Sequence, residues 1–202
     1  MPKTGLRGRT RVKVVHHSEL ILGGVRSGKS RYALARAREA PGPAVFVATA
    51  QPLDALMQAR IAAHRAERPR NWTTVEEPFE IVPACRRLQD RHQVVLLDCL
   101  TLWVSNRLLR RDGEELILAE TDELTKFMGE RVLSFVVVSN EVGAGVHAAT
   151  EVGLRFSDLM GQVNQRVAAA ADRVTLMIAG IPLTIKDGLV PPVFHERAPE
   201  AP

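Results

Sequence analysis

Short apolar runs alternate with longer segments of helical periodicity along most of the chain. The apolar runs have the length of buried strands and lie at residues 19–22, 44–49, 94–97, 135–139 and 174–179. Residues 183–185 are consistent with a further strand at an edge. Because strands that are apolar throughout need cover on both faces, the pattern predicts an α/β fold with a mostly parallel sheet flanked by helices. We expect a single domain over residues 18–188.

The segments between these runs predict helices. Most of them are rich in helix-forming residues and lie at 29–40, 53–67, 78–90, 101–111 and 114–131. A further helix is indicated by apolar residues that recur at spacings of three and four, namely Val152, Phe156, Leu159, Val163, Val167 and Ala170. Strand and helix therefore alternate through the whole predicted domain.

The positive charge of the chain is concentrated at its N-terminus. The whole chain has 27 basic and 23 acidic residues, and the first 18 positions hold no acid but five bases, Lys3, Arg7, Arg9, Arg11 and Lys13. The rest is therefore close to neutral. We predict a basic, disordered leader at residues 1–17 and a disordered tail at residues 189–202, which is rich in proline and alanine. A contact of the leader with nucleic acid or a membrane is the alternative.

Composition argues against such partners for the domain itself. Aromatic residues make up 4% of the chain, which leaves few platforms for stacked bases. The leader lacks the apolar stretch of a secretory signal, and no run approaches the roughly 18 apolar residues of a membrane span. Cys85 and Cys99 have neither metal-ligand nor disulfide spacing. We expect a cytoplasmic protein without nucleic-acid or membrane partners.

A glycine-rich segment between the first strand and the first helix fits the Walker A pattern. It consists of Gly23, Gly24, Val25, Arg26, Ser27, Gly28, Lys29 and Ser30. The glycines let backbone N–H groups approach phosphate oxygens, and the following helix directs its free N–H groups at the same place. Lys29 is the expected catalytic cation at the β- and γ-phosphates, and the Ser30 hydroxyl is placed for Mg²⁺. A glycine-rich turn with an incidental Lys-Ser pair is the alternative.

The apolar run at 94–97 ends in Asp98, as a Walker B strand does. A carboxylate at the end of that strand lies beside the phosphate loop and helps to hold Mg²⁺. An acid that only caps the strand end is the alternative, and the presence of the phosphate loop favours the metal role. The sequence thus predicts a Mg²⁺ site formed by Ser30 and Asp98.

Four further blocks follow the phosphate loop in order. They lie at 59–78, at 139–145 (Ser-Asn-Glu-Val-Gly-Ala-Gly), at 161–172 (beginning Gly-Gln-Val-Asn-Gln) and at 179–183 (Ala-Gly-Ile-Pro-Leu). With the Gly-Gly-x-Arg-Ser-Gly-Lys-Ser form of the loop, they resemble the bifunctional adenosylcobinamide kinase / adenosylcobinamide-phosphate guanylyltransferase family over residues 20–186. This resemblance implies a P-loop NTPase-like (RecA-like) fold and a homotrimer.

The resemblance implies two reactions of cobalamin biosynthesis. ATP or GTP phosphorylates a hydroxyl of the corrinoid substrate adenosylcobinamide, and GMP from GTP is then joined to that phosphate with release of pyrophosphate. In the family the second step passes through a guanylylated histidine, and the matching position is His64. A neutral imidazole suits this attack. Without the resemblance, His64 would be interpreted as a packed core residue, because it lies close to the stripe of Leu53, Met57 and Ile61.

Other positions match the family's nucleotide contacts. The resemblance assigns them to Thr49, Ala50, Gln51, Arg65, Ala66, Glu67, Arg68, Glu76 and Asp98. The guanidinium groups of Arg65 and Arg68 suit phosphate charge. Glu76 is a candidate acceptor for the guanine edge or the ribose hydroxyls, and a solvated acid beside Glu77 is the alternative.

The chain departs from the family pattern in two places. Ala63 stands where many members have a second histidine before the nucleophile, and residues 146–149 and 154–158 lack the usual proline and some of the arginines. The latter segment is a candidate contact with the corrinoid or with a neighbouring subunit. A monofunctional P-loop kinase, a lone guanylyltransferase and a nucleotide-dependent binding module are the alternative functions.

Overall fold

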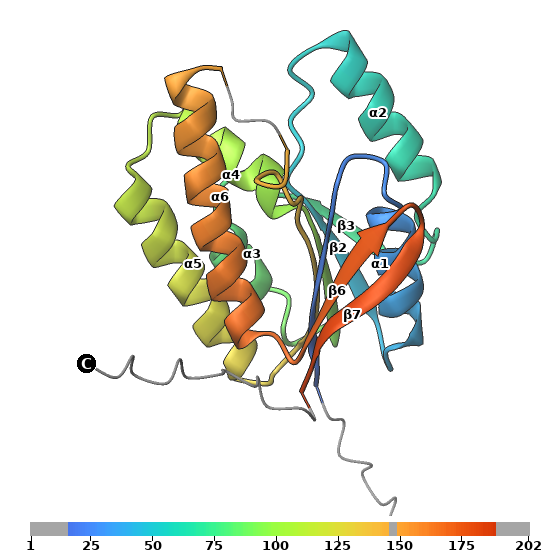
Figure 1. Ribbon diagram of the computed structural model, residues 1–202. Helices are drawn as coiled ribbons and strands as arrows, with labels where there is room; N and C mark the ends of the chain where they lie inside the picture. The colour runs from blue at the N-terminus through green and yellow to red at the C-terminus, as the bar shows by residue number, and fades with distance from the viewer. Residues whose placement is uncertain (1–15, 146–148, 189–202) are drawn as a thin grey trace, which may run out of the picture.

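Seven strands form one sheet in the computed structural model of the chain, which describes residues 16–145 and 149–188. The strands are β1 (Ser18–Gly23), β2 (Ala44–Ala48), β3 (Thr73–Glu76), β4 (Val94–Asp98), β5 (Ser134–Val138), β6 (Arg173–Ile178) and β7 (Ile181–Asp187). Their order is β3-β2-β4-β5-β1-β6-β7, and within this sheet only β6 and β7 pair antiparallel (Figure 1). The predicted mostly parallel sheet, with an edge strand after the last buried one, is confirmed.

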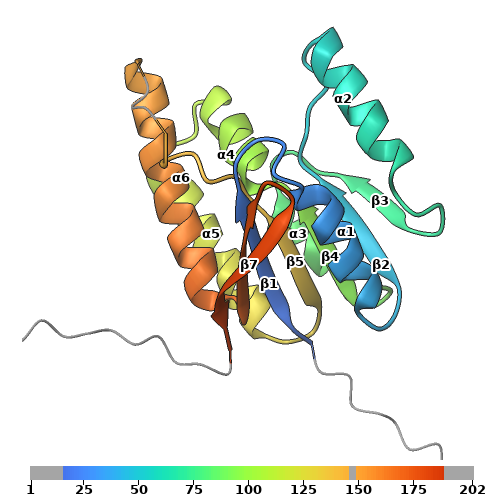
Figure 2. The same ribbon diagram turned by 45° about the vertical axis from the view of Figure 1, so that its right-hand side comes forward.

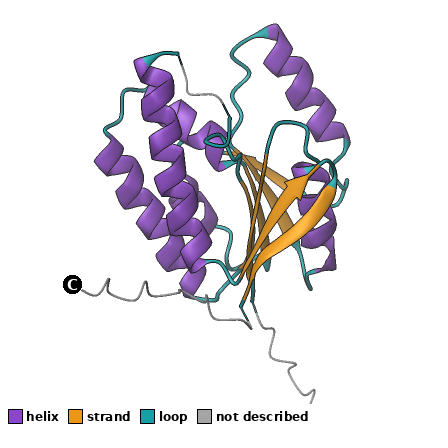
Figure 3. Ribbon diagram, viewed as in Figure 1, coloured by secondary structure: helices purple, strands orange, loops and turns teal. Residues whose placement is uncertain are grey.

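Helices cover both faces of the sheet, as Figure 3 shows. They are α1 (Lys29–Glu39), α2 (Ala55–Ala66), α3 (Ile81–Arg86), α4 (Leu100–Leu109), α5 (Glu114–Gly129) and α6 (Glu151–Ala170). Alternate strand residues such as Leu20 and Val95 pack with α3 to α6, whereas their neighbours Ile21 and Leu96 pack against α1. Strands that are apolar on both sides require helices on both faces of the sheet, and the structure provides them. No helix of the described segments is long and apolar enough to cross a bilayer.

The carboxyl ends of β1 and β4 face the same edge of the sheet, because both strands run parallel to β5, which lies between them. The phosphate loop follows β1, and Asp98 ends β4. A strand inserted between these two is the arrangement of RecA-like P-loop proteins, so the expected fold class is confirmed. It brings the loop and the carboxylate to one place although they are 68 positions apart in sequence.

Two features of the 73–90 region differ from the sequence prediction. Thr73–Glu76 forms an edge strand, β3, which we did not predict although two threonines and a valine favour strand. The helix predicted at 78–90 is reduced to the six residues of α3. Its expected first turn is a loop instead, in which the Glu77 carboxylate accepts hydrogen bonds from the N–H groups of Phe79 and Glu80. The carbonyls of Pro78 and Phe79 bind side chains of α4.

Several predicted features lie outside the described residues. They are the tail at 189–202, residues 146–148, and the leader except for His16 and His17. The other divergent segment, 154–158, lies in α6.

An ion pair joins the segment before β5 to the turn before β6, and hydrogen bonds attach the start of β1 to it. The Asp172 carboxylate binds Arg131 and accepts hydrogen bonds from the backbone N–H and hydroxyl of Ser18, at 2.8 and 2.9 Å. Burial alone raises the pKa of Asp172, but the bonds from Arg131 and Ser18 outweigh it and hold the pKa at about 2, against an ordinary 3.8. The pair therefore stabilises the fold above about pH 4, and this contribution is lost as the pH falls towards 2.

We expect Arg131→Leu to lower the free energy of unfolding at pH 7 by about 1 kcal/mol, allowing for solvent screening of the half-exposed arginine. Urea unfolding at several pH values between 7 and 3 measures this, and the difference from the wild type should shrink below pH 4. Arg155→Leu, which removes an exposed pair with Glu114, is the control and should cost less. A difference that is constant with pH would contradict the assignment to Asp172.

Candidate active site

The phosphate loop turns sharply at two glycines. Gly23 has a φ of 150°, and a Cβ there would lie 2.5 Å from the Met177 carbonyl oxygen. Gly28 has a φ of 95°, and a Cβ there would lie 3.3 Å from the Cα of Gly180. No side chain caps the start of α1, which begins at Lys29. The backbone N–H groups of its first turn therefore remain available to an anion.

Lys29 is buried inside the loop that it follows. Its ammonium group donates to the Gly24 carbonyl at 2.6 Å and to the Ser27 hydroxyl at 3.5 Å. Burial lowers the pKa of Lys29, and nearby Cys99 and Asp98 oppose the shift. The Lys29 ammonium group therefore lies beside the space in which the backbone N–H groups of the loop would bind phosphate oxygens.

Asp98, at the end of β4, is the centre of a small group of polar side chains. Burial raises its pKa, and four groups oppose that shift: His64, the Ser30 hydroxyl, Arg68 and Lys29. The carboxylate and the hydroxyl are hard oxygen donors on neighbouring elements. Mg²⁺ prefers such donors and usually takes one or two of them together with substrate phosphates. The residues present therefore fit the predicted Mg²⁺ site.

His64 lies in the last turn of α2 and faces Asp98. Its Nδ1 is 3.9 Å from the Asp98 Oδ2, and about a third of its side chain is exposed. The alternative interpretation of His64 as a core residue is wrong, because α2 has no buried residue at all. Leu53, which the stripe interpretation placed in the core, is 67% exposed, and neither Met57 nor Ile61 is buried. The helix stands beside the sheet end and extends away from the body of the protein (Figures 1 and 2).

A cavity of about 1220 Å³ lies between the phosphate loop and α2. Its lining brings together most of the predicted site, namely Val25, Arg26, Ser27, Gly28, Lys29, Ser30, Ala50, His64, Glu67, Arg68 and Asp98. Loop, nucleophile candidate and carboxylate therefore share one space. Its size is that of a pocket for a nucleotide or a larger ligand.

A second hollow of about 670 Å³ contains the remaining charged candidates. Arg65, Ala66 and Glu76 line it, and Arg65 forms an ion pair with Glu76. Arg68 lines both spaces, and its guanidinium lies 3.8 Å from the centre of the Phe46 ring. The two hollows therefore adjoin each other at Arg68.

Four predicted positions line neither space: Gly23, Gly24, Thr49 and Gln51. The two glycines shape the loop. The Thr49 hydroxyl is buried, where it donates to the Cys99 carbonyl and accepts from the Cys99 N–H, both at 2.8 Å. This hydroxyl therefore ties the end of β2 to the residue after Asp98.

Four polar residues that line the cavity were not predicted as site residues, namely Arg31, Arg38, Arg60 and Asn140. Arg60 lies one helical turn before His64, and its position four residues away was the available signal. Asn140 follows β5, and its backbone N–H donates to the Thr101 hydroxyl at 2.8 Å. A single asparagine after a strand gives no comparable signal.

Comparisons with known proteins agree over most of the chain. A family model described as cobinamide kinase / cobinamide phosphate guanyltransferase matches residues 19–185. The chain is 42% identical to the bifunctional adenosylcobalamin biosynthesis protein CobP of Pseudomonas aeruginosa over 168 residues, which cover 83% of this chain and 96% of that protein. It is 37% identical to the protein CobU of Escherichia coli over 179 residues, 83% of this chain and 98% of the relative.

A solved structure, the KaiC-like protein PH0186 of Pyrococcus horikoshii, aligns with a TM-score of 0.47 and 14% identity, over 80% of this chain and 71% of the other. No functional conclusion follows from a likeness at this level.

Proposed function

The chain belongs to the cobinamide kinase / cobinamide phosphate guanyltransferase family, and from this premise we propose that the single cavity over the phosphate loop serves both reactions. It is a bifunctional enzyme of cobalamin biosynthesis. The observation that supports the shared cavity is the position of His64, which faces Asp98 across 3.9 Å and lines the same space as Lys29 and Ser30.

In the kinase step, ATP or GTP binds with its phosphates on the backbone N–H groups of Gly23–Ser30. Lys29 neutralises charge on the β- and γ-phosphates, and Ser30 and Asp98 would hold Mg²⁺, which neutralises further charge when bound. The corrinoid hydroxyl attacks the γ-phosphorus and releases its proton. A new P–O bond forms, the bond to the β–γ bridging oxygen breaks, and a nucleoside diphosphate leaves.

In the transfer step, an imidazole nitrogen of His64 attacks the α-phosphorus of GTP. The N–P bond forms, and the bond to the departing pyrophosphate breaks. The Asp98 carboxylate, close to Nδ1, balances the positive charge that the ring gains. A phosphate oxygen of the corrinoid then attacks the same phosphorus, which gives adenosylcobinamide-GDP and regenerates neutral His64.

We assign the remaining nucleotide contacts to residues of both hollows and to Thr49 and Gln51, which flank Ala50 of the first hollow. Thr49, Ala50 and Gln51 form the segment between β2 and α2, and Arg65 to Arg68 follow His64 directly. Arg68, shared by the two spaces, is placed for phosphate or ribose, and Glu76 for the guanine N1–H and amine. The ion pair between Arg65 and Glu76 orients that carboxylate.

We also propose residues 18–188 as the catalytic domain, a homotrimeric assembly and a cytoplasmic location. Leu53, which precedes α2, and Leu56, on this helix without buried residues, are both exposed and suit contact with another copy. Both cysteines are buried and unpaired, as in a reducing compartment.

The proposal is tested by incubating the protein with Mg²⁺ and GTP labelled at the α- or the γ-phosphate, followed by denaturation. We expect label from α-labelled GTP alone to stay on the protein, to be lost in acid and to survive base, because a phosphoramidate has these properties. No retained label in either sample would contradict a covalent guanylyl intermediate, and retained γ-label would indicate a phosphoenzyme instead.

A further inference from the structure

The position of α2 depends on the segments at its two ends. No residue of this helix is buried, so packing on the body of the protein does not fix its place. The chain enters α2 from the end of β2 and returns from it to β3, an edge strand whose residues are mostly exposed. Because β3 pairs in register with β2, whatever fixes the carboxyl ends of these two strands also limits where α2, and with it His64, can lie.

Asn106, in the middle of α4, joins these two strand ends. Its side-chain amide donates one hydrogen bond to the Thr49 carbonyl at 2.7 Å and another to the Pro78 carbonyl at 3.1 Å. Thr49 directly follows β2, and Pro78 lies two residues after β3. The asparagine is 4% exposed, so solvent cannot easily replace either bond.

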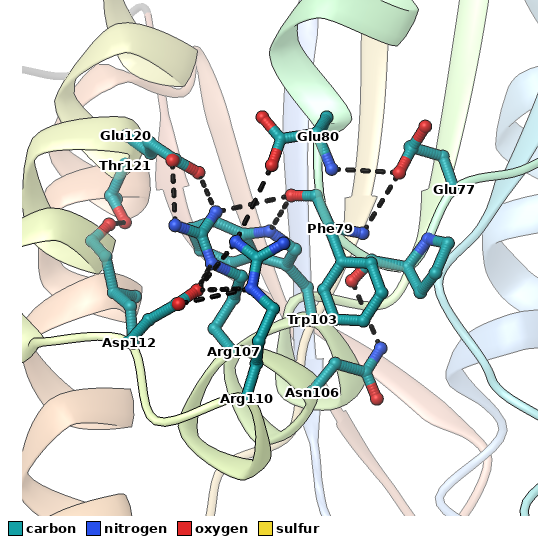
Figure 4. A network of polar contacts seen from close by, with 12 residues as sticks. Glu77, Phe79, Glu80, Trp103, Asn106, Arg107, Arg110, Asp112, Glu120 and Thr121 are labelled. Carbon is teal, nitrogen blue, oxygen red and sulfur yellow. Dashed lines mark hydrogen bonds and ion pairs between the residues drawn. The ribbon is translucent and has the colours of Figure 1, made fainter.

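Neighbouring side chains of α4 strengthen the attachment on the β3 side (Figure 4). The Trp103 indole N–H donates to the Phe79 carbonyl at 2.7 Å, and Arg107 reaches the same oxygen at 3.4 Å. Arg107 is fully buried and is held in turn by the carboxylates of Asp112 and Glu120. Charged groups with this many fixed partners leave α4 little freedom to move.

The same helix is fixed relative to Asp98. It begins at Leu100, two residues after that carboxylate, and the intervening Cys99 exchanges two hydrogen bonds with the Thr49 hydroxyl. At the other side of the cavity, the Thr101 hydroxyl accepts the N–H of Asn140. Asp98, the end of β2 and the loop after β3 are thus fastened to one rigid element.

We propose that Asn106 is a positioning residue for guanylyl transfer, holding the carboxyl ends of the two strands that flank α2 in the chain so that His64 faces Asp98 and the α-phosphate of bound GTP. The inference rests on the proposed function of His64. Asn106 touches no cavity space itself and acts through Thr49 and Pro78. Removing its two donors loosens the start of the segment that leads from β2 into α2 and the loop after β3, while the phosphate loop, on the far side of β5, keeps its own contacts.

The test uses Asn106→Leu, which keeps the approximate volume and removes both donors. The rate at which α-label accumulates on the full-length protein is measured against GTP concentration, and binding of ATP to the phosphate loop is measured alongside. We expect the rate at saturating GTP to fall about 10- to 100-fold, since a small misplacement of a reacting group has an effect of that order. The half-saturating GTP concentration and the affinity for ATP should stay within about 2-fold.

Thr121→Val is the matched control. It also removes a buried hydrogen-bonding group, but the Thr121 hydroxyl binds only the Ile117 carbonyl of its own helix. Melting temperatures of both variants are compared, and the control should label at about the wild-type rate. If Asn106→Leu does not fold, Asn106→Ser, which is too short to bridge both carbonyls, should show the same loss in rate.

The outcomes separate the two proposals. If the wild type labels and Asn106→Leu labels equally fast, or if the control slows as much, the positioning role is overturned and the role of His64 stands. If Asn106→Leu loses ATP binding as well as labelling, the positioning role is also overturned, because the substitution then damages the whole nucleotide site. If the wild type takes no label, the proposed function fails and the positioning role fails with it.

Discussion

Replacing His64 with alanine is expected to abolish retention of α-label and formation of adenosylcobinamide-GDP, while phosphorylation of adenosylcobinamide continues. The imidazole supplies the atom that forms the covalent bond, and the neighbouring guanidinium groups of Arg60 and Arg68 carry only N–H donors, with no free lone pair that could replace it. We expect a loss of at least about 10³-fold in transfer, the size seen when a nucleophile is removed. Kinase activity should stay within about 3-fold, because His64 bonds to none of the loop groups.

Two assays on the same preparation check this result. One measures denaturation-resistant α-label, and the other measures transfer of the γ-phosphate to the corrinoid. His92→Ala is the matched control, since this histidine contacts the Leu88 carbonyl and the Thr73 hydroxyl and does not line the cavity. Full labelling of His64→Ala would show that another group is the nucleophile. Loss of both activities would place His64 in the kinase step as well.

The parts of the site that lie in one sequence segment could be predicted from sequence. The phosphate loop is such a segment, because the steric demands at Gly23 and Gly28 and the helix start at Lys29 are local. Asp98 could be placed beside it because parallel strands end at a common edge. In both cases, local chemistry and one topological rule are sufficient.

The region around α2 could not be derived in this way. The stripe of Leu53, Met57 and Ile61 predicted a buried face, but Leu53 is exposed and no residue of α2 is buried. Periodicity indicates that a helix has an apolar face and does not say whether the same chain covers it. His64 was found through a family resemblance alone, and its approach to Asp98 depends on contacts that are distant in sequence.

Asn106 is a second residue whose role could not be predicted from a local sequence pattern. It lies on a helix that was predicted correctly, but a single asparagine there carries no recognisable pattern. Its role depends on two carbonyl groups, which come from residues 57 and 28 positions earlier in the chain. The shortened α3 has the same cause, because the carbonyls of Pro78 and Phe79 bind α4 instead of continuing a helix.

Lys29→Met is expected to remove both activities at once, in contrast to His64→Ala. Methionine has nearly the length of lysine and fills the same buried position, so the loop should keep its shape while losing its cation. Both reactions move a phosphorus of one bound triphosphate, and each needs charge neutralised on the leaving phosphates. Phosphorylation of the corrinoid and retention of α-label should each fall by about 10²- to 10³-fold.

The matched control for this change is Lys126→Met, which removes an exposed lysine of α5, on the opposite face of the sheet from α1. It should leave both rates within about 2-fold, and the two variants should melt at similar temperatures. If Lys29→Met keeps either activity above about a tenth of the wild-type rate, the triphosphate of that reaction does not use the loop as proposed. Loss of phosphorylation alone would mean that GTP binds elsewhere in the transfer step, with the hollow lined by Arg65 and Glu76 as the next candidate.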